Sequence, residues 1–201
     1  MIGFINKFKE YKAMSPIIEK ELLSKIKVLH KRKGDFLYRE NQFPNSVYLI
    51  TKGCLRTFYH KNGKEKNTMF IFENLIFGST SSVFLELPSI DSAQFLEDST
   101  IEYVYHPDLA ALYNKYTEME TYRRKIAEEY CIFLEEKIRL TENTATDKYR
   151  IIVERFPHIL QRVSLQDIAT LLNISQETLS RIRANIRFWL MSKNVAQMLF
   201  T

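Results

Sequence analysis

Polar side chains that can read base pairs recur at helical spacing near the end of this 201-residue chain. They are Ser175, Gln176, Glu177, Thr178, Ser180, Arg181 and Arg183. Arginine pairs with guanine through two hydrogen bonds, glutamine pairs with adenine, and glutamate accepts a hydrogen bond from cytosine. Ser175 and Thr178 can contact phosphates, as can the N-terminus of a helix. The pattern therefore predicts a helix whose polar face binds double-stranded DNA.

Two short helices joined by a tight turn are predicted over residues 164–186 to position these side chains. Ser164 and Ser175 are typical N-cap residues, and Asn173 between them tolerates the left-handed conformation of a sharp turn. Ala169 is small enough for a second helix to cross closely. The inward positions of that second helix are Leu179, Ile182 and Ile186. An ordinary helical hairpin with a polar solvent face is the alternative, but the two caps, the alanine and the turn asparagine together favour a helix-turn-helix.

A long helix is predicted over about residues 118–142, which contain no glycine or proline. Its apolar stripe consists of Ala127, Tyr130, Cys131, Leu134 and Ile138. At 1.5 Å per residue, such a helix is roughly 37 Å long, which exceeds what a small domain needs for its own core. We therefore favour a homodimer seam along this stripe over purely internal packing. Cys131 is expected to act there as a small buried hydrophobe.

Short segments rich in β-branched and aromatic residues predict a small all-β barrel or roll from about Ile26 to Tyr105. The breaks between the strands fall at Lys33-Gly34-Asp35, Gly53 and Asn62-Gly63. The Asn-Gly pair is the strongest of these hairpin signals. Helices are predicted before the roll, over residues 16–29, and after it, starting at His106.

The composition excludes several classes of protein. With 45% apolar and 26% charged residues, the chain is neither disordered nor fibrous. No apolar stretch approaches the roughly 20 residues of a membrane helix, and the N-terminus lacks a secretory signal, so a cytoplasmic location is expected. Two cysteines alone supply neither a disulfide framework nor a four-ligand metal site. A net charge of +5 over residues 148–201, behind −3 over residues 117–147, favours a polyanionic partner.

The order of roll, long helix and helix-turn-helix resembles the Crp/Fnr family of bacterial transcription regulators over about residues 20–187. The segments that carry the resemblance are Gly34-Asp35-Phe36-Leu37, residues 47–56 and residues 175–182. The first two look like that family's cyclic-nucleotide-binding-type roll, and the third looks like its recognition helix. Matched to the family pattern, Gln176, Glu177 and Arg181 fall where the family makes its main base contacts.

The resemblance implies an α+β fold in three parts. A double-stranded β-helix of jelly-roll type with flanking helices, the sensor, would occupy residues 1–116. A connecting and dimerisation helix would follow over residues 117–145. A helix-turn-helix domain with a C-terminal tail would occupy residues 146–201. The resemblance also implies a non-enzymatic homodimer whose partners are double-stranded DNA and RNA polymerase. It implies no membrane association, and the sequence does not identify the effector.

The segment that would hold a ligand departs from the pattern of the family members that bind cyclic AMP. Those members hold the phosphate with a Gly-Glu pair and a downstream Arg-Ala, and here both the glutamate and the arginine are missing. A phosphate without an arginine partner loses a charge-assisted pair. We therefore expect no cyclic AMP binding and no other cofactor. Any ligand would sit at Gly78, Ser79, Ser81 and Ser82. The alternative, that this pocket is filled or vestigial, is equally compatible with the sequence.

Two further observations bear on the class of the protein. The chain lacks the N-terminal cysteine cluster of the oxygen-sensing members, which excludes an iron–sulfur sensor. The segment of residues 187–201 shows no clear hairpin turn for a DNA-binding wing, and the sequence does not decide whether this apolar tail docks on the domain.

Two other functions compete with a DNA-binding regulator. A metal-dependent oxygenase on a small β-barrel needs converging histidines and carboxylates, whereas the four histidines here are widely scattered. A ligand-sensing dimer that acts through a protein partner is the stronger alternative, and it predicts no preference among DNA sequences.

Overall fold

The structure is a computed structural model that describes residues 3–186. The chain divides into two compact units, Met1–Glu136 and Lys137–Thr201. The sequence expectation for the tail over residues 187–201 lies outside the described residues. Among the helices of the described part, none combines the length and the apolar character needed to span a bilayer.

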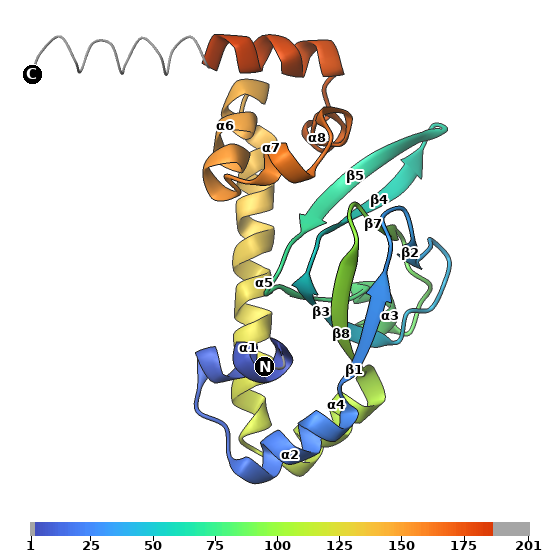
Figure 1. The fold of residues 1–201 in the computed structure, drawn as a ribbon, viewed down its shortest axis with the longest axis vertical. Helices are drawn as coiled ribbons and strands as arrows, with labels where there is room; N and C mark the ends of the chain where they lie inside the picture. The colour runs from blue at the N-terminus through green and yellow to red at the C-terminus, as the bar shows by residue number, and fades with distance from the viewer. Residues whose placement is uncertain (1–2, 187–201) are drawn as a thin grey trace, which may run out of the picture. The chain divides into compact units, whose positions relative to one another are not determined.

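Eight strands within residues 3–186 form two four-stranded antiparallel sheets, which make up the roll of the first unit (Figure 1). The strands are β1 Lys27–Lys31, β2 Phe36–Tyr38, β3 Ser46–Lys52, β4 Leu55–Lys61, β5 Lys64–Ile71, β6 Ile76–Phe77, β7 Ser92–Phe95 and β8 Ser99–Tyr105. Their orders are β1-β8-β3-β6 and β2-β7-β4-β5. Ile50 and Ile101 of one sheet pack with Leu55 and Phe95 of the other in a single buried cluster. The predicted all-β region from Ile26 to Tyr105 is confirmed, with one short helix inserted in it.

The turns between strands lie where the sequence predicts them. Asn62 and Gly63 join β4 to β5 with φ angles of 53° and 71°, the positive pair that a two-residue hairpin of this type requires. Gly53, between β3 and β4, has a φ of 103°. Its backbone passes Ser99 so closely that a Cβ would lie 2.8 Å from the Ser99 Cα. Glycine is therefore required at residue 53 for both its conformation and its size.

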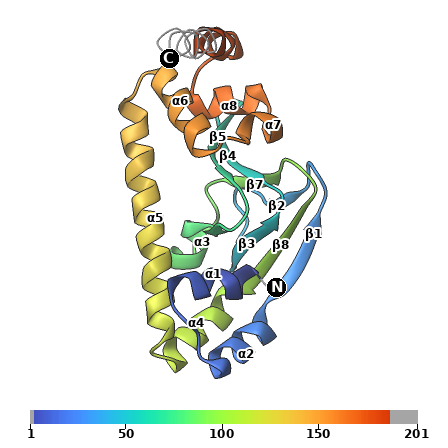
Figure 2. The same ribbon diagram turned by 60° about the vertical axis from the view of Figure 1, so that its left-hand side comes forward.

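Four helices of the first unit pack at one end of the roll (Figures 1 and 2). They are α1 Gly3–Tyr11, α2 Pro16–Lys25, α4 His106–Lys115 and the first half of α5 Met119–Glu142. The helix predicted from residue 16 ends at Lys25 instead of residue 29, because Val28 and Leu29 pair with β8. The helix α1 has no marker in the sequence pattern and was not expected.

The long helix α5 is confirmed at 24 residues. Its first half contacts the roll unit through one face only. Tyr122 on this face is fully buried and stacks on Phe8 of α1, with ring centroids 5.0 Å apart. Ile126, one turn further on, packs against the same apolar cluster. The side of α5 that faces the roll is thus set by Tyr122 and Ile126.

The second unit is helical throughout its described part. Its helices are α6 Ala145–Arg155, α7 Ile159–Arg162, α8 Leu165–Leu172 and a helix over residues 176–186. They enclose a small core that contains Tyr149, Ile152, Ile168, Leu172 and Leu179. The helix α6 ends at Arg155, two residues before Pro157.

We expect Gly53→Ala to lower the free energy of unfolding by about 3 kcal/mol, because the new methyl group overlaps Ser99 and the residue must keep a positive φ. Gly34→Ala is the matched control. Gly34 also has a positive φ, of 88°, but a Cβ added there would meet nothing within 4 Å, so a loss of about 1 kcal/mol is expected. Urea unfolding followed by circular dichroism measures both losses, and equal losses would contradict the close approach to Ser99.

Candidate functional site

The helix α8 begins at Ser164, as the sequence predicts. The Ser164 Oγ accepts the backbone N–H of Asp167 at 3.0 Å, and its hydroxyl donates to the Asp167 carboxylate at 2.6 Å. This reciprocal pair satisfies an N–H group that the first turn of a helix leaves without a partner. Ala169 on the inner face of α8 is completely buried, as expected for a small residue at a helix crossing.

The turn after α8 is built on Asn173. Its φ of 57° and ψ of 42° place it in the left-handed conformation. The N–H of Ile174 then donates to the Ala169 carbonyl at 3.0 Å, which closes the end of α8. Ser175 starts the next helix, since its Oγ accepts the N–H of Thr178 at 3.1 Å. Only three residues separate the two helices, so the chain changes direction sharply between them.

The second of these helices has a buried side and a polar, exposed side. Leu179 and Ile182 are 0% and 8% exposed, and Ile186 is half-buried. The exposed predicted DNA-binding residues are Ser175, Gln176, Glu177, Ser180 and Arg181, and the half-buried ones are Thr178 and Arg183. The predicted set of polar side chains therefore gathers along one accessible surface at the start of this helix.

Two of these side chains are held in defined states. A hydrogen bond from Ser175 lowers the pKa of Glu177, with smaller contributions from its own backbone N–H and from the charge of Arg181. Glu177 therefore stays ionised and accepts hydrogen bonds at neutral pH. Arg181 donates to the Thr178 Oγ1 at 3.4 Å, which leaves most of its guanidinium N–H groups free to bind other acceptors.

Within residues 3–186, the apolar stripe predicted on α5 is left mostly exposed. Ala127, Tyr130, Cys131 and Ile138 are exposed, and Leu134 is half-buried. The expectation that Cys131 is buried is wrong for the single chain. The physical reason is the rotation of roughly 100° per residue in a helix, which turns Cys131 about 180° away from Tyr122, the residue that faces the roll.

The four residues expected at a ligand site lie at the start of α3 Thr80–Leu85, and the hydroxyls of two of them, Ser79 and Ser82, take part in local hydrogen bonds. The Ser79 Oγ accepts the N–H of Ser82 at 3.4 Å, and the Ser82 hydroxyl donates to the Leu87 carbonyl at 3.0 Å. Both serines are buried. Gly78 passes the Ser46 carbonyl so closely that a Cβ would lie 3.2 Å from that oxygen. Ser81 is half-buried.

This segment offers no cationic side chain to the phosphate of a cyclic nucleotide. Between Gly78 and Phe95 the chain has no lysine, arginine or histidine, while Glu86 and Asp91 add negative charge. No arginine of the segment could form a charge-assisted pair with an anion there, and the Ser79 and Ser82 hydroxyls already take part in local hydrogen bonds. The residues on which the sequence expectation rested are therefore arranged as helix caps and turns.

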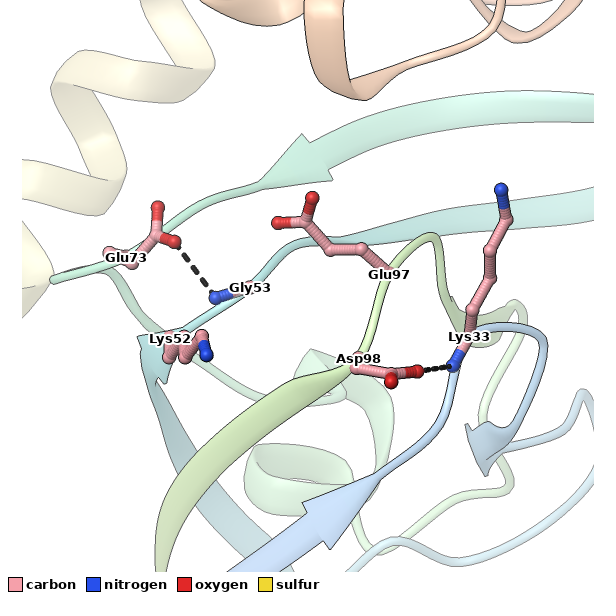
Figure 3. A pocket seen from close by; sticks show the side chains of 6 residues that line it. All are labelled: Lys33, Lys52, Gly53, Glu73, Glu97 and Asp98. Atoms are coloured by element: carbon pink, nitrogen blue, oxygen red, sulfur yellow. Dashed lines mark hydrogen bonds between the residues drawn. The ribbon is translucent and has the colours of Figure 1, made fainter.

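A separate hollow of about 500 Å³ lies at the loops between strands, and the sequence analysis did not identify it (Figure 3). Its lining residues are Lys33, Lys52, Gly53, Glu73, Glu97 and Asp98. Glu73 accepts the N–H of Gly53, and Asp98 accepts that of Lys33, both at 2.8 Å (Figure 3). These two carboxylates thus stabilise the loops. No sequence motif marks this hollow, because its residues come from four separate turns.

Two four-stranded antiparallel sheets with an inserted α3 and a following long helix define a β-roll of the cyclic-nucleotide-binding type. Residues 28–116 match the family model of the cyclic nucleotide-binding domain. The first unit is therefore a cyclic nucleotide-binding-type β-roll with added helices, in a mixed α+β chain. A search of curated proteins found no match to the sequence.

Solved structures with the same fold include FixK2 from Bradyrhizobium japonicum, at 18% identity and a TM-score of 0.68, covering 82% of this chain and 85% of that one. The c-di-GMP responsive global regulator CLP from Xanthomonas campestris matches at 15% identity and a TM-score of 0.60, and the match covers 86% of this chain and 92% of that one. The catabolite activator protein of Thermus thermophilus matches at 19% identity and a TM-score of 0.52, and the match covers 88% of this chain and 85% of that one. At sequence identities this low, the structural likeness shows a shared fold alone. The covered fractions mean that the likeness continues past the roll.

We expect Asn173→Ala to destabilise the second unit by about 1 kcal/mol, because alanine does not favour the left-handed conformation that ends α8. Asn173→Gly is the control, since glycine adopts that conformation without a steric penalty. Thermal unfolding of the two variants measures the difference. A loss for glycine as large as that for alanine would show that the asparagine side chain, and not the backbone conformation, maintains the turn.

Proposed function

We propose that this protein is a dimeric, sequence-specific DNA-binding transcription regulator of the Crp/Fnr type. The observation that carries the proposal is the sharp turn at Asn173 between two capped helices, the second of which exposes Gln176, Glu177 and Arg181 on one surface. That arrangement supports a helix-turn-helix, whose second helix would enter the major groove. The fold shared with FixK2 and the global regulator CLP supports it.

Each polar residue of the second helix has a role in the proposed complex. Arg181 would pair with guanine, Gln176 with adenine, and the ionised Glu177 would accept a hydrogen bond from cytosine. Ser175, Thr178, Ser180 and Arg183 would contact phosphates or neighbouring bases. Because the basic excess of residues 148–201 is +5, non-specific attraction to the DNA backbone would add to these contacts and would weaken with salt.

The exposed stripe of α5 is the proposed dimer seam. Ala127, Cys131 and Leu134 lie on the side of the helix opposite the buried Tyr122, so packing against the roll leaves them available to a second chain. Two such helices related by a two-fold axis bury matching stripes. The dimer would present two recognition helices to half-sites about 34–36 Å apart on a pseudo-palindromic site.

The proposed division of the chain follows these roles. Residues 1–116 form the sensor, residues 117–145 connect and dimerise, and residues 146–201 bind DNA, with RNA polymerase as a further partner. The roll would respond to an effector other than cyclic AMP, or to none, since the segment from Gly78 to Phe95 offers no cation to a phosphate. A ligand-sensing dimer that acts only through a protein partner is the alternative, and DNA selection distinguishes the two.

We expect Arg181→Ala to weaken binding to the preferred DNA site by about 1–3 kcal/mol, because a bidentate contact to a base is lost. Binding to random duplexes should change much less. Fluorescence anisotropy titrations with both kinds of duplex measure the ratio.

Arg150→Ala is the matched control for this titration. It removes the same charge from the exposed helix α6, and it should weaken binding to both duplexes alike. An Arg181→Ala variant that loses no preference for the selected site would contradict the assignment of the recognition helix.

We expect Leu134→Asp to dissociate the dimer, because it places a charge in the apolar seam. Ile132→Asp is the control, since Ile132 is 57% exposed on the same helix but lies outside the stripe. Sedimentation velocity measures both variants at matched concentrations.

The exposed Cys131 gives a second readout of the seam. In a parallel two-fold dimer it faces its own copy, so a short bismaleimide should link two chains in the unmodified protein and not in Cys131→Ser. Monomeric protein in sedimentation, with no linked product, would contradict the seam.

A further inference from the structure

The N-terminal end of α1 is fixed to the roll by a buried carboxylate. Glu102 of β8 is 5% exposed, and its two oxygens accept the backbone N–H groups of Gly3 at 2.8 Å and Phe4 at 2.9 Å. A carboxylate in this position satisfies free N–H groups and interacts favourably with the helix dipole. The Gly3 backbone lies so close to β3 that a Cβ would be 2.7 Å from the Leu49 Cδ2. Glu102 thus connects the start of α1 directly to β8.

The middle of α1 is fixed to α5. Lys7 is only 7% exposed, and its ammonium lies 3.1 Å from the Glu129 carboxylate of α5 and 4.9 Å from the Tyr11 ring centroid. Phe8, one residue further, stacks on Tyr122 of α5. The same ammonium lies 3.3 Å from the Glu10 carboxylate of α1, so Lys7 bridges a carboxylate of its own helix and Glu129 of α5.

The C-terminal end of α1 contacts the segment that leads to the candidate ligand site. The Asn74 amide donates to the Glu10 carboxylate at 3.1 Å. Hydrogen bonds from Asn74 and from Lys7 lower the pKa of Glu10, so this carboxylate stays ionised at neutral pH. Asn74 lies just before β6, and β6 leads into Gly78 and α3. One nine-residue helix thus touches the roll, the segment before the candidate ligand site, and α5.

We propose that α1 is a coupling element that transmits displacements of the roll to α5, with Glu102 and Lys7 as its positioning residues. The inference rests on the proposed function in one respect, since it takes α5 to be the helix that joins two chains. A change at β6 or β8 moves α1 through Asn74 or Glu102, and α1 moves α5 through Lys7 and Phe8. Such an element gives an effector in the roll a route to the dimer helix by differential contacts.

Hydrogen exchange of the full-length protein, free of DNA, tests this coupling. Glu102→Gln keeps the shape of the side chain but removes its charge and turns an N–H donor toward one of the two helix N–H groups. We expect exchange to accelerate by about tenfold or more in α1 and in residues 119–129 of α5, with little change in β4 and β5. Glu86→Gln, which neutralises an exposed carboxylate at the end of α3, is the control and should change neither helix.

Faster exchange in α1 alone, with exchange in α5 unchanged, would overturn the proposal. It would show that α1 packs on the roll without coupling the roll to α5. If Glu102→Gln loosens the whole roll, Lys7→Met decides instead. This variant keeps the aliphatic stem of Lys7, loses the link to Glu129, and should accelerate exchange in residues 119–129 while β8 stays protected. No acceleration in α5 would overturn the coupling. Because neither readout involves DNA, a failure of DNA binding is recognised separately.

Discussion

The stacking of Phe8 on Tyr122 determines which side of the long helix α5 packs against the rest of the first unit. It buries one side of α5 against the roll, and the periodicity of the helix then leaves Ala127 and Cys131 exposed and Leu134 half-buried on the opposite side. An exposed apolar stripe of this kind is costly in a monomer and useful in a dimer. The same contact makes α1 part of the boundary between the roll and α5, so the position of a short N-terminal helix constrains the surface proposed for a second chain.

Features that depend on local chemistry could be predicted from the sequence. The hairpin at Asn62-Gly63, the caps at Ser164 and Ser175, and the left-handed turn at Asn173 all lie where residue type predicted them. Each is determined by interactions within three or four residues, so no knowledge of the rest of the fold is needed. The length of α5 was predictable for a related reason, because an uninterrupted run of helix-forming residues suffices to define it.

Features that depend on distant partners could not be predicted. The helix α1 is only nine residues long, and its first N–H groups are satisfied by Glu102, which lies 99 residues further along the chain than Gly3. The ligand site expected at Gly78, Ser79, Ser81 and Ser82 stays a prediction. In the structure, the Ser79 and Ser82 hydroxyls take part in local hydrogen bonds. The single chain leaves Cys131 exposed, because an apolar stripe in a sequence does not show which chain covers it.

Selection of duplexes from fragmented genomic DNA by the full-length protein at physiological salt tests most directly whether this chain is a dimeric reader of DNA sequence. We predict enrichment of a pseudo-palindrome whose half-sites lie about one helical turn apart, as two symmetry-related recognition helices require. Binding that is sensitive to salt but indifferent to sequence, with and without a panel of nucleotides and metabolites, would contradict the proposed function.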